Sequence, residues 1–150
     1  MCAADARSEP DFVDLRFHEL TVDQLHEIYH LRSVVFVVEQ ACIYNDVDGR
    51  DAEPGTVHHW VERNGRIASY ARSLDDGDGV RRVGRVVTHP DHRGHGLAAD
   101  LVRHIGRGHS GPLVLDAQSH LAEWYEALGY RVDGPEFIDD GIPHKPMRRA

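Results

Sequence analysis

Three strand-like runs follow one another in the middle of the chain, with no helical pattern between them. The first two, 58–63 and 66–74, are separated by Asn64-Gly65, a dipeptide typical of the tight turn of a β-hairpin. A polar turn then leads into the third run, 80–88. Parallel strands need long crossovers between them, whereas consecutive hairpins join antiparallel strands. This meander therefore predicts a sheet built largely from antiparallel pairs.

An amphipathic helix is expected before the meander. Thr21 and Gln24 form a capping box, and apolar side chains then recur at helical spacing as far as Phe36. The run 34–38 is also β-branched and apolar, so the pattern leaves the end of this helix open. From 45 to 55 the chain is rich in Asp, Gly, Glu and Pro, which predicts a loop.

After the meander the pattern changes to alternating helices and strands. The segment 97–105 has one apolar helical face, and 113–117 is a short apolar run typical of a buried strand. The segment 88–113 is long enough for a parallel, right-handed strand–helix–strand unit. Ser119 is a candidate N-cap for a last helix that ends at Gly129. The expected class is α+β, a mixed, mostly antiparallel sheet with flanking helices. Late strands are expected at 130–132 and 142–147.

Length and composition limit the classes of protein. The 150 residues suit one domain, expected to span 13–150 behind a flexible N-terminal segment, 1–12. With 17 Lys and Arg against 25 Asp and Glu, the net charge is −8, which argues against an electrostatic nucleic-acid binder. No run resembles a membrane span or a signal peptide, and Cys2 and Cys42 make no disulfide framework. We therefore expect a soluble, cytoplasmic protein that binds neither nucleic acid nor membrane.

The segment 93–98, Arg-Gly-His-Gly-Leu-Ala, lies at the entrance of the helix expected from Leu97. Glycines allow the backbone to approach a ligand closely, and the free N–H groups of a first helical turn favour phosphate oxygens. Arg93 adds a charge-assisted contact to an anion. The segment therefore predicts a phosphate site. The alternative is that Gly94 and Gly96 only form a tight turn.

A dinucleotide fingerprint is also present. Gly94-x-Gly96-x-x-Ala99 has the required spacing, and Asp116 follows Gly96 by 20 positions, about where a ribose-binding acid is found. In a Rossmann fold, however, the glycines follow the first strand and several strand–helix–strand units come after them. Here a meander precedes the glycines. A Rossmann-type dinucleotide-binding protein is therefore the less favoured alternative.

No metal site is expected, although the chain has 12 histidines. His89, His92 and His95 are evenly spaced, but they lie in a Pro- and Gly-containing loop that gives no fixed geometry. The acidic segment 46–51 resembles a calcium loop, yet Val57 stands at the twelfth position, where such a loop has glutamate.

Taken together, the strand 83–88, the Arg93-x-x-Gly96-x-Ala98 loop and the helix behind it resemble the coenzyme A signature of the GNAT N-acetyltransferases. Further segments resemble the ElaA-type branch of that superfamily, and the resemblance covers about 17–148 in the correct order. The matching segments are Leu31-Arg32, Val35-Phe36-Val37-Val38-Glu39-Gln40, Tyr44-x-Asp46-x-Asp48-Gly49, Gly84-Arg85-Val86, Ala117-Gln118, Trp124-Tyr125 and Asp140-Gly141-Ile142-Pro143-His144 with Met147.

This resemblance implies a GNAT acyl-CoA N-acyltransferase fold with acetyl-CoA as the donor. The acetyl group would pass to a primary amine by direct attack in a ternary complex. The N–H groups of Val86 and Val87 would hold the pantetheine arm and polarise the thioester carbonyl, and the pyrophosphate would lie on 93–98. The residues assigned to the coenzyme are Val86, Val87, Arg93, Gly94, His95, Gly96, Leu97, Ala98 and Gln118.

Acetyl transfer to an amine needs a base for the amine proton, and an acid assists the leaving thiolate. Tyr125 matches the position where many GNAT enzymes place a tyrosine beside the sulfur, which implies a general acid. The alternative is that Tyr125 only packs in the core. The base stays open between Glu39, His144 and a relayed water. The alternatives are that Glu39 pairs with an arginine such as Arg32 and that His144 only hydrogen-bonds a loop.

The acceptor that this reaction implies is a small-molecule or peptide amine. The acids Asp46, Asp48, Asp139 and Asp140 are candidates to attract a cationic amine, or are simply solvated loop residues, which is the favoured interpretation. A non-catalytic acyl-CoA sensor or interaction module is an alternative function. A homodimer is compatible with the exposed sheet edge expected of this fold.

Overall fold

The computed structural model describes residues 10–150 of the chain. Its strands are β1 (Asp11–Arg16), β2 (Val57–Arg63), β3 (Arg66–Asp75), β4 (Arg81–Thr88), β5 (Leu113–Gln118), β6 (Arg131–Val132), β7 (Phe137–Asp139) and β8 (Ile142–Arg149). The α-helices are α1 (Val22–Arg32), α2 (Leu97–Arg107) and α3 (Ala122–Glu126). Short helices of other types are η1 (Phe17–Glu19), η2 (Ser33–Glu39), η3 (Arg50–Ala52), η4 (Pro90–His92) and η5 (Ser119–Leu121).

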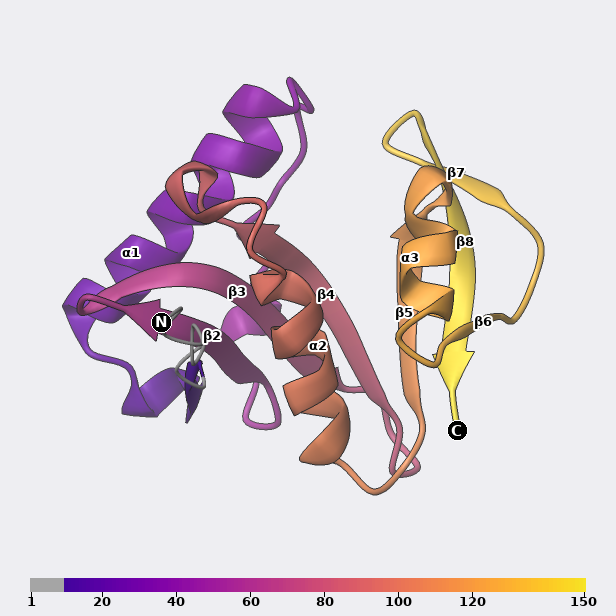
Figure 1. Cartoon of the computed structure of the whole chain (residues 1–150), viewed down its shortest axis with the longest axis horizontal. Helices are drawn as coiled ribbons and strands as arrows, with labels where there is room; N and C mark the ends of the chain where they lie inside the picture. Colours follow the sequence, from indigo (N-terminus) through magenta and orange to yellow (C-terminus); the bar gives the residue numbers. More distant parts are fainter. Residues whose placement is uncertain (1–9) are drawn as a thin grey trace, which may run out of the picture.

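All eight strands form one mixed sheet (Figure 1). The order is β1-β2-β3-β4-β5-β8-β6, and β7 pairs with β8. β4 and β5 run parallel, and the other pairs are antiparallel. The expected α+β class, the meander and the β4–α2–β5 crossover are therefore confirmed.

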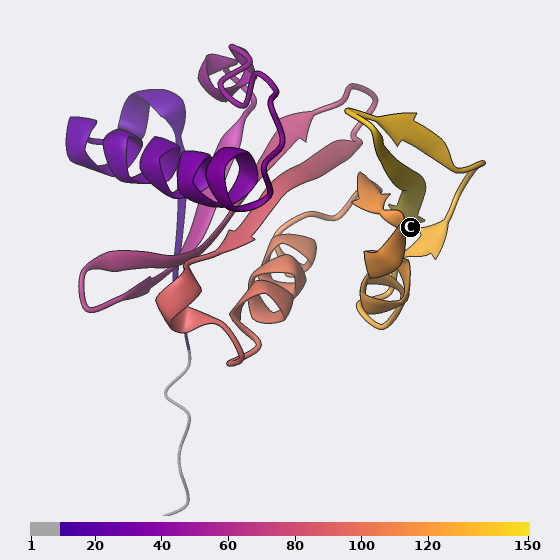
Figure 2. The ribbon, with the colours of Figure 1, turned by 90° about the horizontal axis from the view of Figure 1, so that it is seen from above.

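Helices cover both faces of the sheet (Figure 2). Alternate residues of a strand point to opposite faces, and the two hydrophobic cores follow this alternation. Trp60 and Tyr70 pack with Ile28 of α1, whereas their neighbours Val61 and Ala71 belong to the core formed with α2 and α3. The strands that build the site belong to the sheet that separates these two cores.

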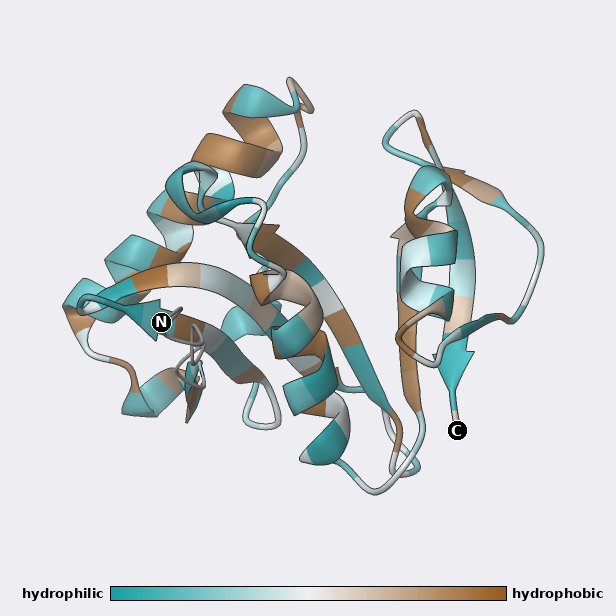
Figure 3. Ribbon diagram, in the orientation of Figure 1, coloured by the Kyte–Doolittle hydropathy of each residue, from teal (hydrophilic) through white to brown (hydrophobic). Residues whose placement is uncertain are grey.

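The β-branched run 34–38 is helical. It forms η2, a π-helix that continues α1, and the Gln40 amide donates to the Val35 carbonyl at 3.0 Å in the i-to-i+5 pattern. Val35 is buried, but Val38 is 73% exposed. Figure 3 shows this segment as a hydrophobic turn beyond α1. The end of the helix, which the sequence left open, therefore lies at Glu39.

The first strand, β1, was not expected. It begins at Asp11, two positions before the expected start of the domain, and the rest of the expected N-terminal segment, 1–9, lies outside the described residues. Asp14 accepts hydrogen bonds from His59 Nδ1 at 2.6 Å and from His104 Nε2 at 2.8 Å, so it joins β1 to β2 and α2. The hydrogen bond from His59 lowers the pKa of Asp14.

The last helix differs from its expectation. Ser119 begins η5 rather than capping α3, and its hydroxyl donates to Glu136 Oε1 at 2.6 Å. α3 is only five residues long. The late strands are confirmed as β6 and β8, and β7 is an additional strand that the sequence pattern did not indicate.

The loop from 45 to 55 contains buried acids, which corrects the interpretation of Asp46 as a solvated residue or an attractor of amines. Arg32, fully buried, binds Asp46 at 2.8 Å and Asp51 at 2.7 Å. Arg72 binds Asp48 at 2.7 Å and Asp51 at 3.2 Å. Burial opposes the ionisation of Asp51, but the hydrogen bonds and charges of both arginines outweigh it and lower its pKa. These ion pairs fix the loop to α1 and β3.

We expect Asp51→Asn to lower the free energy of unfolding by about 3 kcal/mol, the lower end of the range for removing one partner of a buried ion pair, because Asp46 still pairs with Arg32. Glu53→Gln is the matched control: its pair with Arg50 is exposed, so the loss should stay within about 1 kcal/mol. Because folding lowers the pKa of Asp51, its contribution is present above the ordinary value of 3.8 and is lost as the pH falls below it. Urea unfolding at pH 7 compares the losses of the two variants, and the same measurement at pH 3 shows how the loss for Asp51→Asn declines. Equal losses for the two variants at pH 7 would contradict the role of the buried ion pair.

Candidate active site

A cavity of about 410 Å³ opens where β4 and β5 separate. The two strands pair only at Arg81–Leu113 and Arg82–Val114, and then diverge (Figure 1). Backbone groups on the facing edges beyond this point have no partner strand. Residues from β4, β5, β8, α3 and the segment after η2 line the cavity.

A β-bulge in β4 lies at this opening. The register of the β3–β4 pair shifts between Tyr70 and Arg72, so two residues of β4, Arg85 and Val86, face a single residue of β3. Arg85 has a φ of 54°, in the left-handed region. Both Arg85 and Val86 line the cavity. The bulge therefore shapes the wall where the two strands part.

Val86 and Val87 present their amides to opposite sides of β4. The His89 amide donates to the Ala68 carbonyl of β3 at 2.8 Å. Because successive peptide groups point to opposite edges of a strand, the Val87 amide also faces β3, where Val87 pairs with Tyr70, and the Val86 amide faces β5. The Val87 side chain is buried in the core under α1. Of the two expected amide donors, Val86 is the one at the cavity.

The expected phosphate loop forms a second, smaller cavity of about 150 Å³ at the N-terminus of α2. Gly94 and Gly96 have φ values of 82° and 72°, which favour glycine. Gly96 is the N-cap and provides no side chain to the first-turn amides, which have no partner within a helix. Trp124 of α3 lines the same cavity, whereas the exposed His95 does not. Of the expected loop residues, this cavity is lined by Arg93, Gly94, Gly96, Leu97 and Ala98.

Tyr125 reaches the larger cavity from α3. Its side chain is packed edge-on against Trp124 and Tyr130, with ring centroids 4.8 and 6.0 Å apart, and the residue is 7% exposed. Burial, with a smaller effect of Tyr130, raises the pKa of Tyr125 well above its ordinary value. The hydroxyl therefore keeps its proton at neutral pH. Tyr125 therefore both packs in the core and lines the cavity.

His144 of β8 lines the same cavity, next to Gln118 of β5, with which it is paired in the sheet. Its Nδ1 lies 2.7 Å from the Ile142 carbonyl oxygen. A carbonyl oxygen only accepts, so Nδ1 carries the hydrogen and Nε2 of the neutral ring is the proton acceptor. Phe137 stacks on the ring at 5.8 Å and holds its plane. The geometry leaves His144 with an available basic nitrogen.

Glu39 does not line the larger cavity with Tyr125 and His144. It ends η2 and forms a two-pronged ion pair with Arg93 of the phosphate loop, at 2.8 and 3.0 Å. Its side chain is half exposed, and it lines neither cavity. The suggested partner, Arg32, is instead held by Asp46 and Asp51. The structure thus places Glu39 beside the phosphate loop and His144 at the opening between the strands.

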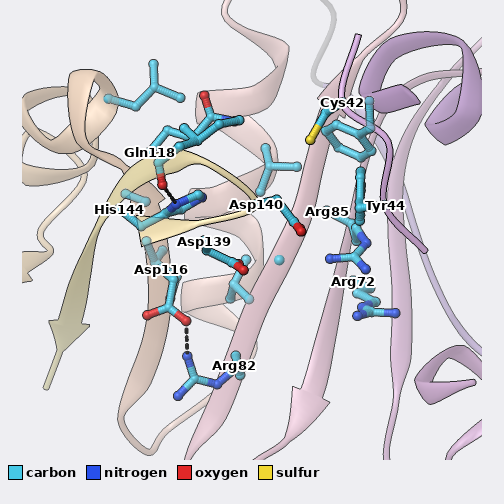
Figure 4. A pocket seen from close by; sticks show the side chains of 18 of the residues that line it. Cys42, Tyr44, Arg72, Arg82, Arg85, Asp116, Gln118, Asp139, Asp140 and His144 are labelled. Atoms are coloured by element: carbon cyan, nitrogen blue, oxygen red, sulfur yellow. Dashed lines mark hydrogen bonds and ion pairs between the residues drawn. The ribbon is translucent and has the colours of Figure 1, made fainter. Parts of the chain in front are cut away.

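Two carboxylates at the larger cavity have no ion pair within the described chain. Each of its arginines is paired with a carboxylate, whereas Asp139 and Asp140 line it without an ion pair to any residue in 10–150. Figure 4 shows both carboxylates directed into the space between the two walls, opposite Arg72 and Arg85. The pairs are Arg50–Glu53, Arg72–Asp48, Arg82–Asp116 and Arg85–Asp46.

Several residues at the cavity were not assigned to the site from the sequence. Phe36 and Cys42 reach it only because the π-helix and the following segment turn toward β4. Within the described part of the chain, no group of three or more His, Cys, Asp or Glu side chains is placed to hold a metal ion. No helix in that part is both long and apolar enough to cross a bilayer.

Comparisons with known proteins give one consistent result. A family model described as an acetyltransferase (GNAT) domain matches residues 33–150. The UPF0039 protein of Mycobacterium tuberculosis strain H37Rv is 40% identical over 139 residues, 87% of each chain. The crystal structure of Escherichia coli ElaA, 33% identical, has a TM-score of 0.86 and covers 94% of this chain and 99% of that chain. An acyl-CoA N-acyltransferase from Pseudomonas aeruginosa, 35% identical, has a TM-score of 0.87 over 93% and 99%.

Proposed function

The chain belongs to the GNAT acetyltransferase family, and on this premise we propose that it transfers an acetyl group from acetyl-CoA to a primary amine by direct attack in a ternary complex. One observation carries the proposal. The opening between β4 and β5 joins an amide donor at Val86, a protonated hydroxyl at Tyr125 and a basic nitrogen at His144 in one cavity. These are the three groups that acyl transfer to an amine requires.

The donor would lie along the opening. The pantetheine arm would replace the missing strand partner beside Val86, and the pyrophosphate would lie on the first-turn amides of α2 and on Arg93. Gln118 on β5 faces the same space from the other side. The residues fit this ligand because Val86 lines the opening between the strands and Arg93, Gly94 and Gly96 line the second cavity at the N-terminus of α2.

The amine would attack the thioester carbon after His144 Nε2 removes its proton. A C–N bond forms, and the carbonyl oxygen gains negative charge that the Val86 amide stabilises. The C–S bond then breaks, and the electron pair leaves with the sulfur. Tyr125 donates its proton to that sulfur, the attacking nitrogen releases its second proton to solvent, and solvent returns a proton to the Tyr125 oxygen, so that free coenzyme A thiol and the acetylated amine are the products.

The acceptor would enter from the side of Asp139 and Asp140, whose unpaired carboxylates favour a cationic amine. A non-catalytic acyl-CoA sensor is the second candidate function. It shares the donor site and differs only in the absence of turnover. A dinucleotide-binding protein would need a continuous parallel sheet around the glycines, and β4–β5 is the only parallel pair among the described strands.

Isothermal titration calorimetry tests the donor site. We expect acetyl-CoA to bind at one site per chain and NADH to give no heat of binding. Binding of NADH with no response to acetyl-CoA would overturn the proposal, because the glycine loop would then serve a dinucleotide.

Gly96→Val should weaken acetyl-CoA binding at least tenfold. Valine strongly disfavours a φ of 72°, so the N-terminus of α2 should distort, and its branched side chain would project into the open space over the first-turn amides. Gly65→Val is a matched control, because Gly65 has the same φ of 72° and equally open surroundings in the β2–β3 turn. Both variants should lose similar stability, and only Gly96→Val should lose affinity in the calorimeter. Equal affinities would contradict the placement of the pyrophosphate.

A further inference from the structure

Arg85 holds an unusual backbone conformation in the wall of the cavity. Its φ of 54° lies in the left-handed region, which is sterically unfavourable for a residue with a Cβ. Such a conformation persists only where the surroundings determine it. The bulge that it creates turns the Val86 amide toward the opening between β4 and β5.

The side chain of Arg85 is held at several points by the segment that follows η2. Its Nε lies 2.9 Å from Asp46 Oδ1, an ion pair without hydrogen-bond geometry, and its Nη2 donates to the Asp46 carbonyl at 3.2 Å. Nη2 also lies 3.4 Å from Asp48 Oδ2. The guanidinium stacks over the Tyr44 ring at 5.3 Å. Figure 4 shows Tyr44 and Arg85 side by side on one wall.

The segment that follows η2 is itself anchored in the protein interior. Asp46 is buried, and its Oδ2 and carbonyl accept hydrogen bonds from Arg32 at 2.8 and 2.7 Å. The Tyr44 hydroxyl donates to Asp46 Oδ1 at 2.8 Å. Because Arg32 is fully buried at the end of α1, the contacts of Arg85 lead to a fixed part of the core.

We propose that Tyr44, Asp46 and Arg85 form a clamp that fixes the bulge in β4, and that Arg85 acts as a positioning residue for the Val86 amide in acyl transfer. The proposal rests on the proposed function for its catalytic consequence. An amide donor stabilises a developing oxyanion only when it is preorganised, so a small rotation of this peptide should lower kcat. The binding of acetyl-CoA should change less, because the phosphate loop does not depend on the clamp.

Comparison of Arg85→Ala with Arg85→Gly tests the clamp. Both variants remove the side chain, but only alanine keeps a Cβ that disfavours the left-handed conformation. We expect kcat to fall for both, and to be roughly 5- to 30-fold lower for alanine than for glycine, which is the cost of about 1–2 kcal/mol for a left-handed L-residue expressed as a rate ratio. Tyr44→Leu keeps Arg85 but removes the ring and the hydroxyl bond, and should lower kcat in the same direction.

Asp78 provides the matched control. It has the same φ of 54°, lies in the turn between β3 and β4, and does not line the cavity. Asp78→Ala and Asp78→Gly should leave kcat unchanged. Equal kcat values for Arg85→Ala and Arg85→Gly would overturn the proposal, since Arg85 would then act by its charge alone. The proposal would also be overturned if Arg85→Ala and Arg85→Gly were both as active as the parent chain.

A measurement without ligand separates this proposal from the proposed function. In ¹H–¹⁵N spectra of the ligand-free protein, the Val86 amide resonance should move in Arg85→Ala and Tyr44→Leu and stay near its original position in Arg85→Gly. This result supports the clamp even if the chain transfers no acetyl group. An unmoved Val86 resonance in all three variants would overturn the clamp even if acetyl transfer is established.

Discussion

Tyr125→Phe should lower kcat at saturating acetyl-CoA by about 10²–10⁴-fold, the usual contribution of a general acid. The phenylalanine ring keeps the edge-on contacts with Trp124 and Tyr130, so the melting temperature should change little. The Kd of acetyl-CoA should also stay similar, because the thioester needs no proton before it is cleaved. Thiol detection at fixed times, thermal unfolding and calorimetric titration of the same preparation measure kcat, the melting temperature and the Kd.

Tyr130→Phe is the control for this substitution. Tyr130 is also a buried tyrosine, but it lines neither cavity, and its hydroxyl has no hydrogen-bond partner among the described residues. Removing that hydroxyl should leave kcat unchanged and should not reduce stability. If Tyr125→Phe behaves in the same way as Tyr130→Phe, Tyr125 is a packing residue and not the acid.

His144→Gln should also lower kcat by about 10²–10⁴-fold, because it removes the basic nitrogen that accepts the amine proton. The dependence of kcat/KM on pH should lose the limb that the base produces. His26→Gln, on the exposed surface of α1, should leave both the rate and the pH profile as they are.

Glu39→Gln distinguishes the two candidate bases. Because Glu39 contacts Arg93 and not the cavity, its loss should act on the KM for acetyl-CoA and leave the shape of the pH profile intact. The opposite pattern, in which Glu39→Gln removes the limb that the base produces and His144→Gln does not, would make Glu39 the base.

The parts of the fold that the sequence predicts are those with local signals. Asn64-Gly65 marks the β2–β3 turn, and the Thr21–Gln24 capping box is observed at the start of α1, with bonds of 2.9 and 3.1 Å. β1 has no such signal, because it depends on pairing with β2, more than 40 positions away. The π-helical geometry of η2 likewise depends on its surroundings and not on its β-branched residues.

The candidate site likewise combines a local feature, which the sequence indicates, with nonlocal contacts, which it does not. The phosphate loop is a local feature, and the glycines at 94 and 96 indicate it directly. In the sequence, Asp46 looks like a solvated loop acid and Asp51 like part of a calcium-type loop, because their partner Arg32 lies 14 and 19 positions away in α1. The pairing of Glu39 with Arg93 spans 54 positions and separates a candidate base from the cavity. Nonlocal contacts of this kind are set by the fold and leave no periodic pattern.

The release of coenzyme A thiol from acetyl-CoA in the presence of primary amines tests the proposed acetyl transfer most directly. A panel of polyamines, small amines and lysine-containing peptides should include at least one acceptor that accelerates release. Mass spectrometry should then find one acetylated amine for each thiol, and Tyr125→Phe should reduce the acceleration by about 10²–10⁴-fold. Binding of acetyl-CoA with no release above spontaneous hydrolysis for any amine would contradict the account and favour a sensor of acyl-CoA.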